Sequence, residues 1–167
     1  MIPRDITIRL ARRSEAATLT DLCTRSKAYW GYDAAFMAAA ARTIEIRERD
    51  IRAKRVLMAV SDFNSARTSV QVPLLGVAAV VPMDNRGVFD LSQRCGGPEA
   101  FGQGIGRALF EAAVQLAVTQ GARRLSILSD PNAAGFYEKL GATRRGEAPS
   151  DAVPGRMLPL FELDIAR

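Results

Sequence analysis

A glycine-rich segment at residues 101–107 constrains the fold of this chain more than any other stretch. It reads Phe101-Gly-Gln-Gly-Ile-Gly-Arg, with glycines at three alternate positions. A strand-like pattern begins before it at residue 88, and apolar residues at helical spacing follow it as far as Thr119. Because glycine has no Cβ, it permits tight turns and close approach of other groups. The segment therefore predicts a strand, a glycine loop and an amphipathic helix in close succession.

Hydrophobic periodicity predicts further elements on both sides of this loop. Strands are predicted at residues 6–10, 56–60, 74–81, 88–92, 125–129, 143–145 and 157–165. Helices are predicted at residues 16–29, 34–54, 107–119 and 131–140, and a polar hairpin loop at 61–71. This order predicts a mixed sheet with helices on both sides. The length of 167 residues favours a single domain over residues 1–167.

The glycine loop has the properties of a backbone anion site. Alternate glycines let successive N–H groups point at one place, and the N-terminus of the following helix adds its positive end. A diphosphate can bind there without a side-chain cation. The chain has no G-K-[ST] motif, and its G-x-G-x-G spacing after several strands differs from the G-x-G-x-x-G of dinucleotide-binding units.

The absence of histidine excludes several kinds of chemistry. No Ser-His-Asp or Cys-His nucleophile system, histidine zinc site or histidine general base is possible. The two cysteines, Cys23 and Cys95, cannot form a metal cluster alone, and we expect free thiols and no metal site. Catalysis must therefore use carboxylates, tyrosines, hydroxyls, a thiol or the backbone.

The charge pattern and the apolar runs bear on partners and location. The net charge is +5, with twenty arginines and three lysines, but the arginines are scattered in pairs and form no nucleic-acid motif. The longest apolar run, 74–81, is far shorter than the ~20 residues of a membrane span. We expect no nucleic-acid or membrane partner. Without a secretory signal, we expect a cytoplasmic protein.

Two segments resemble signatures of the GCN5-related N-acetyltransferases, the GNAT family. Gly102-Gln-Gly-Ile-Gly-Arg-Ala-Leu resembles the acetyl-CoA diphosphate loop, and Ser129-Asp-Pro-Asn-Ala-Ala-Gly-Phe-Tyr-Glu-Lys-Leu-Gly-Ala resembles the second signature, a helix after the fifth strand. The resemblance implies an α/β (α+β) fold with a mostly antiparallel central sheet of about six to seven strands. It also implies an enzyme that transfers an acetyl group from acetyl-CoA, its cosubstrate, to a primary amine of a small molecule or peptide by direct attack.

The resemblance also assigns residues to the coenzyme and to catalysis. Its coenzyme-binding positions are Phe101, Gly102, Gln103, Gly104, Ile105, Gly106, Arg107, Asn132, Ala134 and Tyr137. Tyr137 matches the family tyrosine that protonates the departing thiolate, a role that suits a phenol. Its alternative is a core tyrosine whose hydroxyl finds a partner. Asn132 could instead cap the short helix, and Arg107 could be a surface residue of the first turn.

The general base and the acceptor pocket have less distinct signals. The family often takes its base from the strand before the loop, where Asp90 is the better choice chemically, with Ser92 on the same face by alternation. Other candidate bases are Glu45, Asp84 and Glu99. Candidates for the wall of the acceptor pocket are Tyr29, Trp30 and Tyr32, which could instead pin the junction of the first two helices.

The chain departs from the family pattern in two places. Phe101 stands where relatives usually carry Arg or Gln. The second departure is the segment Gln93-Arg94-Cys95-Gly96-Gly97, which stands where relatives have an apolar strand. Because such a sequence is a poor strand former, the segment could run in register, bulge or become ordered on ligand binding. A second hypothesis is therefore a GNAT-fold protein that binds CoA or acyl-CoA with little or no turnover. An exposed final hairpin would also allow a homodimer.

Overall fold

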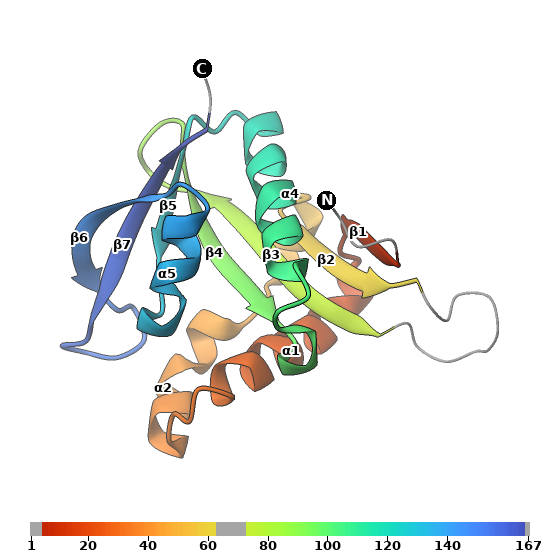
Figure 1. Ribbon diagram of the computed structural model, residues 1–167, viewed down its shortest axis with the longest axis horizontal. Coiled ribbons are helices and arrows are strands. Elements are labelled where there is room, and N and C mark those ends of the chain that lie inside the picture. Colours follow the sequence, from red (N-terminus) through yellow and green to blue (C-terminus); the bar gives the residue numbers. More distant parts are fainter. Residues whose placement is uncertain (1–4, 63–72, 166–167) are drawn as a thin grey trace.

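A seven-stranded sheet forms the centre of the described part of this protein, residues 5–62 and 73–165 of a computed structural model. Its strands lie in the order β1-β2-β3-β4-β5-β7-β6 (Figure 1). The strands are β1 (Ile6–Leu10), β2 (Val56–Ser61), β3 (Leu74–Pro82), β4 (Val88–Gly96), β5 (Arg124–Leu128), β6 (Thr143–Pro149) and β7 (Met157–Asp164). Among them, β4 and β5 pair in parallel and the other neighbours are antiparallel. The expected mixed, mostly antiparallel sheet is confirmed.

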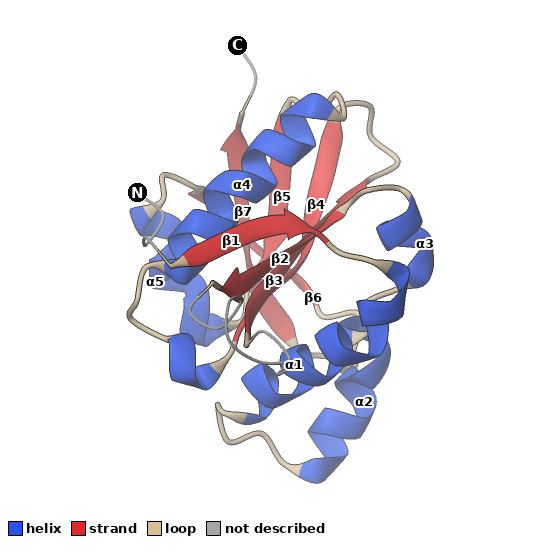
Figure 2. Ribbon diagram, turned by 90° about the vertical axis from the view of Figure 1, so that its right-hand side faces the viewer, coloured by secondary structure: helices blue, strands red, loops and turns tan. Residues whose placement is uncertain are grey.

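Helices cover both faces of this sheet, as expected. The described elements are α1 (Ala16–Ala28), α2 (Ala34–Ile44), α3 (Glu48–Arg52), α4 (Ile105–Thr119) and α5 (Ala134–Lys139), with 3-10 turns η1 (Arg13–Glu15), η2 (Pro98–Ala100) and η3 (Pro131–Ala133). Figure 2 shows α4 and α5 on one side of the sheet and α1, α2 and α3 on the other. None of these described helices combines the length and the apolar character that crossing a lipid bilayer requires.

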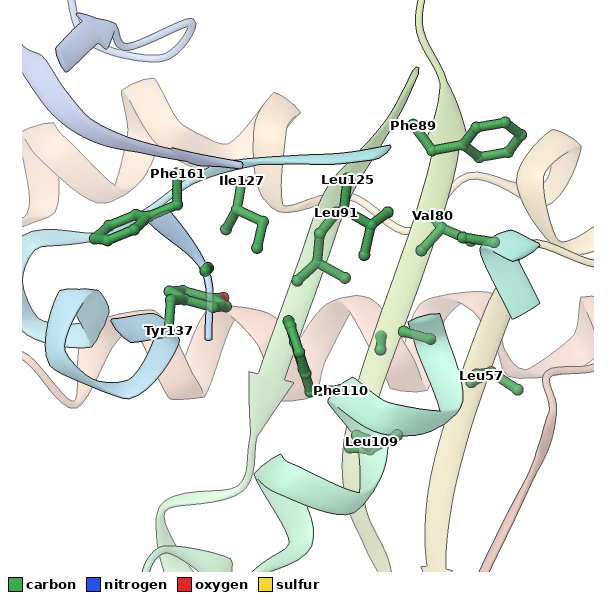
Figure 3. Close-up of a cluster of buried hydrophobic side chains, with 14 of the residues drawn as sticks. Leu57, Val80, Phe89, Leu91, Leu109, Phe110, Leu125, Ile127, Tyr137 and Phe161 are labelled. Atoms are coloured by element: carbon green, nitrogen blue, oxygen red, sulfur yellow. The ribbon is translucent and has the colours of Figure 1, made fainter. Parts of the chain in front are cut away.

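Two apolar clusters fill the spaces between the sheet and its helices. One lies under α4 and α5 and includes Leu109, Phe110, Leu125, Ile127 and Phe161 (Figure 3). The other lies under α1, α2 and α3 and includes Leu19, Leu22, Ile44, Ile51 and Met58. Strand β3 contributes to both clusters through alternate residues. This is why its sequence is apolar at nearly every position, as predicted for a central strand.

The helix predicted over 34–54 is wrong in its middle. Asp33 does cap α2, because its Oδ1 accepts a hydrogen bond from the Phe36 N–H at 2.8 Å. The helix then ends at Ile44, and the Ile46 N–H donates to Thr20 Oγ1 on α1 at 2.9 Å. The break buries the Ile46 side chain, which is 4% exposed. The predicted loop at 61–71 lies outside the described residues from residue 63 onward.

Strands β4 and β5 separate soon after they begin. Their parallel pairing joins Val88–Asp90 to Arg124–Ser126, at three positions. Beyond Asp90, β4 continues along β3 as far as Gly96, whereas β5 continues along β7. The two strands therefore diverge toward their carboxyl ends, and the chain after β4 leads through η2 into the N-terminus of α4.

Candidate functional site

A cavity of about 660 Å³ lies where β4 and β5 diverge. Segments from both sides of the sheet line it: α1, α2, β4, the loop before α4, the segment around η3 and α5, and the connection between β6 and β7. Its lining includes Trp30, Asp90, Arg94, Gly102, Gly106, Tyr137 and Asp151. The divergence of two strands thus produces a space in which residues far apart in sequence meet.

The backbone of the glycine loop presents N–H groups to one end of this cavity. Gly104 is the N-cap residue of α4 and has φ +78°, in the left-handed region that glycine adopts at low cost. The first turn that follows leaves the N–H groups of Ile105, Gly106 and Arg107 without acceptors inside the helix. Ile105 is 2% exposed and anchors the loop in the core. This arrangement fits an anion at the helix N-terminus.

Side chains of the same loop turn to other partners. Gln103 Nε2 donates to the Glu99 carbonyl at 2.9 Å, and Gln103 does not line the cavity. Arg107 lines the cavity but is exposed and pairs with Glu111 at 3.1 Å. The backbone is therefore the main polar feature that the loop itself offers to a ligand.

Two of the three predicted acceptor-pocket aromatics pack against this loop. The Tyr29 ring meets the Phe101 ring edge-on at 5.1 Å between centroids, and the Trp30 ring stacks on Phe101 at 6.2 Å. All three are among the exposed large apolar side chains. Of the predicted acceptor residues, Trp30 lines the cavity, whereas Tyr29 and Tyr32 do not. An aromatic cluster thus borders the start of the loop, on the side of α1.

Tyr32 belongs to a polar clamp, which we define as Lys27, Tyr32, Asp130 and Arg156. Asp130 Oδ2 accepts from Lys27 Nζ at 2.6 Å and from Tyr32 Oη at 2.8 Å, and Arg156 Nη2 donates to Tyr32 Oη at 2.8 Å. Burial acts to raise the pKa of Asp130, but the Lys27 hydrogen bond and the Asn132 N–H outweigh it and lower this pKa. The clamp joins the region of α1 and α2 to the end of β5 and to the β6–β7 connection.

Two of the three predicted coenzyme contacts near α5, Asn132 and Ala134, differ in position. Asn132 lines the cavity, and both its N–H and its Nδ2 donate to Asp130 Oδ1, at 3.0 and 2.9 Å. Asp130 is the cap residue of η3 with Pro131 next to it, as the sequence predicts. Ala134 packs against the core cluster under α4 and does not line the cavity.

Tyr137 sits between the core and the cavity. Its ring packs near Phe110 and Phe161, at 6.0 and 6.1 Å between centroids (Figure 3), and the residue is 6% exposed. Its Oη accepts a hydrogen bond from Arg94 Nε at 3.1 Å and still has its own proton to donate. The hydroxyl is therefore fixed by packing on one side and by a cation on the other.

Asp90 is the candidate base that the structure places in the cavity. Glu45, Asp84 and Glu99 are exposed and do not line it. Burial, reinforced by the neighbouring Asp151 carboxylate, raises the pKa of Asp90 from 3.8 to about 6. Asp90 pairs with Ser126 at the last position where β4 and β5 are neighbours. It therefore lies where the gap between the two strands begins. A carboxyl group with this pKa can accept a proton near neutral pH.

The unusual segment 93–97 continues β4 as far as Gly96 and follows a bulge. Ala79 pairs with Gln93, but Val80 pairs with Leu91, so Ser92 is an extra residue on β4. A bulge of this kind reverses the alternation of side chains along a strand. Gln93 Nε2 accordingly donates to the Thr43 carbonyl on α2, whereas Arg94 points to Tyr137 on the opposite face. Both cysteines are free thiols, as expected, and both line the cavity.

Arg94 is the site residue that sequence reasoning missed. Simple alternation would place Asp90, Ser92 and Arg94 on one face. The extra residue moves Arg94 to the face of α4 and α5, where its guanidinium carbon lies 4.0 Å from the centroid of the Phe136 ring. The sequence signal for Arg94 was its position in a polar, glycine-containing strand segment. The direction of its side chain depends on the bulge, which is set by pairing with β3.

Comparisons with known proteins agree on one fold. A comparison with curated protein sequences finds no significant match. Among solved structures, a GCN5-related N-acetyltransferase from Rhodopseudomonas palustris is 19% identical, with 98% of each chain covered and a TM-score of 0.68. The PaiA N-acetyltransferase from Thermoplasma acidophilum, in complex with coenzyme A, is 17% identical, with 95% of this chain and 98% of that chain covered and a TM-score of 0.68.

A third structure and a family model complete the comparison. A Salmonella typhimurium protein solved with its cofactor acetyl-CoA is 20% identical, with 97% of this chain and 95% of that chain covered and a TM-score of 0.67. At such identities the likeness shows a shared fold. The model of the acetyltransferase (GNAT) family matches residues 29–142, well over half of the sequence and including the glycine loop and Tyr137. This chain therefore belongs to the GNAT family of acetyltransferases.

Proposed function

We propose that this protein is an acetyl-CoA-dependent N-acetyltransferase that acetylates a primary amine of a small molecule or peptide by direct attack. The observation that carries the proposal is the shared cavity. It brings the free N–H groups at the start of α4, the Tyr137 hydroxyl and the Asp90 carboxylate into one space. The anion site can hold the coenzyme, and a proton donor and a proton acceptor can serve the transfer itself.

The residues of the cavity suit the coenzyme in shape and charge. The amides of Ile105, Gly106 and Arg107 would hold its diphosphate. Gly102 and Gly104 would allow close approach, because no heavy atom lies within 4 Å of the position that a Cβ on either would occupy. When bound, acetyl-CoA would supply the acetyl group and a thiolate leaving group. Asn132, in η3 just before α5, lines the same cavity and would contact the arm of the coenzyme that links its diphosphate to the acetyl group.

Asp90 and Tyr137 would move two of the protons of the transfer. The Asp90 carboxylate would take a proton from the acceptor ammonium, so that the neutral amine can attack the acetyl carbonyl. Once the carbon–nitrogen bond has formed, the nitrogen would lose a second proton to solvent. As the carbon–sulfur bond breaks, Tyr137 gives its hydroxyl proton to the departing sulfur. The resulting tyrosinate would lie 3.1 Å from Arg94 Nε and then regain a proton from solvent.

Two measurements in sequence test this function. Thermal unfolding with acetyl-CoA in excess should raise the melting temperature, because a ligand at a hundred times its Kd adds about 2.7 kcal/mol of stability. A panel of amino acids, diamines and peptides should then include an acceptor that releases free CoA thiol. No thermal shift with acetyl-CoA or CoA would refute the proposal. A thermal shift without thiol release from any acceptor would favour the alternative, a coenzyme-binding protein without turnover.

A further inference from the structure

Arg94 is a partly buried cation that has no carboxylate partner within residues 5–62 and 73–165. It lines the cavity, and none of the ion pairs among the described residues involves it. Its contacts are the Tyr137 hydroxyl, the face of the Phe136 ring and the first turn of α4. A charge in such a place costs free energy unless a group of opposite charge compensates it. The described protein residues do not provide that group.

The end of the guanidinium faces the glycine loop. Arg94 Nη1 lies 2.9 Å from the position that a Cβ on Gly106 would occupy, beside the first turn of α4. The N-terminus of a helix carries a partial positive charge, so the guanidinium and the helix repel each other. An anion that binds the free N–H groups of this turn would attract both. The Arg94 guanidinium and the N-terminus of α4 are thus arranged to bind the same anion.

The single cation of the loop, Arg107, lines the cavity but is already paired with a carboxylate. Phe101 is apolar, Gln103 is neutral and bonded to the Glu99 carbonyl, and Arg107 is exposed and paired with Glu111. Arg94 reaches the same turn from the neighbouring strand because the bulge at Ser92 places it on the face of α4 and α5. The two departures of this sequence from the family pattern, at Phe101 and at 93–97, are therefore complementary.

We propose that Arg94 is a coenzyme-binding residue whose guanidinium supplies the diphosphate with the positive charge that the loop lacks at Phe101. The Phe136 ring and the Tyr137 hydroxyl hold the guanidinium beside the loop. This inference rests on the proposed function, since it assumes that coenzyme A binds in this cavity. The role proposed for Arg94 is binding of the diphosphate, which is separate from the acetyl transfer step.

The test compares two ligands and three variants. Trp30 is the single tryptophan of the chain and lines the cavity, so its fluorescence can report binding of coenzyme A and of pantetheine, which lacks the diphosphate. Arg94→Met should weaken coenzyme A binding by about tenfold to a hundredfold, as for loss of a charged hydrogen bond, and leave pantetheine affinity within about twofold. Arg94→Lys should restore part of the loss. Arg52→Met, which removes an exposed charge outside the cavity, should bind both ligands as the wild type does.

Salt dependence provides a second readout of the same charge. Coenzyme A affinity of the wild type should fall more steeply with added KCl than that of Arg94→Met. Unchanged coenzyme A affinity in Arg94→Met would overturn the proposal while leaving the function intact. An equal loss for both ligands, with a lower melting temperature, would also overturn it and indicate a structural role. Failure of the wild type to bind coenzyme A at all would remove the proposed function together with this inference.

Discussion

Replacing Tyr137 by phenylalanine removes a single oxygen atom and tests whether the Tyr137 hydroxyl is the proton donor. Its ring is packed against Phe110 and Phe161, so Tyr137→Phe should keep its place in the core. We expect kcat to fall by about a hundredfold to ten-thousandfold, the range for loss of a general acid, with little change in coenzyme affinity. Stopped assays of thiol release and fluorescence titration would measure the two effects. Tyr29→Phe, at an exposed tyrosine outside the cavity, is the matched control.

A different result for Tyr137→Phe would exclude the assigned role. If turnover stayed within twofold of the wild type, another group or solvent would have to protonate the thiolate. The assay should use an acceptor for which thiol release, and not product departure, limits the rate. Single-turnover measurements would establish that condition.

Asp90 should determine the acidic limb of the pH–rate profile. Burial and Asp151 raise its pKa to about 6. Since the base must be deprotonated to accept the amine proton, kcat/KM should rise with pH through this value and level off above it. Asp90→Asn should lose most of the activity and this limb of the profile. A limb that persists in Asp90→Asn would assign the titration to another group.

The same carboxyl group should cost stability at neutral pH. A raised pKa means that folding favours the protonated form, so the unfolding free energy is highest below the unfolded pKa and declines as pH rises through about 6. A rise from 3.8 to about 6 corresponds to at most roughly 3 kcal/mol. Asp90→Asn should therefore melt at a higher temperature than the wild type at pH 7.5, and the difference should disappear below about pH 4. Equal melting temperatures at pH 7.5 would contradict the burial of this charge.

At the scale of elements, the turn that starts α4 depends on a left-handed residue. Gly104 has φ +78° and no heavy atom within 4 Å of the position that a Cβ would occupy, so Gly104→Ala adds backbone strain without a clash. We expect a loss of about 1 kcal/mol of stability and a weaker coenzyme affinity, because the N–H groups of the turn would be redirected. Gly121→Ala is the control, since Gly121 at the other end of α4 has φ +93° and equally open surroundings.

Comparison of the two glycine variants separates strain from binding. Both should lose similar stability in urea unfolding. Gly104→Ala alone should lose affinity for coenzyme A, and equal affinities in the two variants would argue against a backbone anion site at this turn.

The polar clamp connects elements that are distant in sequence. Asp130 takes hydrogen bonds from Lys27 and Tyr32, and its carboxylate is also 3.9 Å from Arg156 Nη2. Asp130→Asn would leave two partly buried cations around a neutral amide, so we expect the unfolding free energy to fall by about 2 kcal/mol. Urea unfolding would measure this loss. Asp21→Asn, which removes an exposed pair with Arg25, should change stability by less than about 0.5 kcal/mol.

At the scale of the whole molecule, the opening between β4 and β5 connects the two faces of the sheet. Arg94 and Tyr137 lie on the side of α4 and α5, and Gln93 reaches α2 on the other side. A coenzyme arriving along the glycine loop and an acceptor arriving from the side of α1 and α2 could therefore meet where the strands part. This arrangement suits a direct transfer between two ligands.

Local features of this fold could be predicted from the sequence because they depend on near neighbours. The glycine loop before α4, the caps at Asp33 and Asp130, and the apolar β3 are set by backbone conformation, side-chain reach and burial on both faces. The resemblance to the family also singled out Tyr137, in the second signature, and Asp90, in the strand before the loop, and both line the cavity. Periodicity, by contrast, wrongly continued the second helix through residues 45–47, since a contact between Ile46 and Thr20 on another helix ends it.

The remaining properties required the tertiary structure, because they arise between segments far apart in the chain. Pairing with β3 creates the bulge at Ser92 and thereby places Arg94 beside Tyr137. Burial beneath neighbouring elements, together with Asp151, raises the pKa of Asp90. Tyr29 and Trp30 pack on Phe101, which is distant in the sequence, whereas Tyr32 belongs to the polar clamp. Of these three aromatics, Trp30 lines the cavity. The sequence alone determined the local conformations and the family, whereas strand pairing and burial decided the electrostatics of the site.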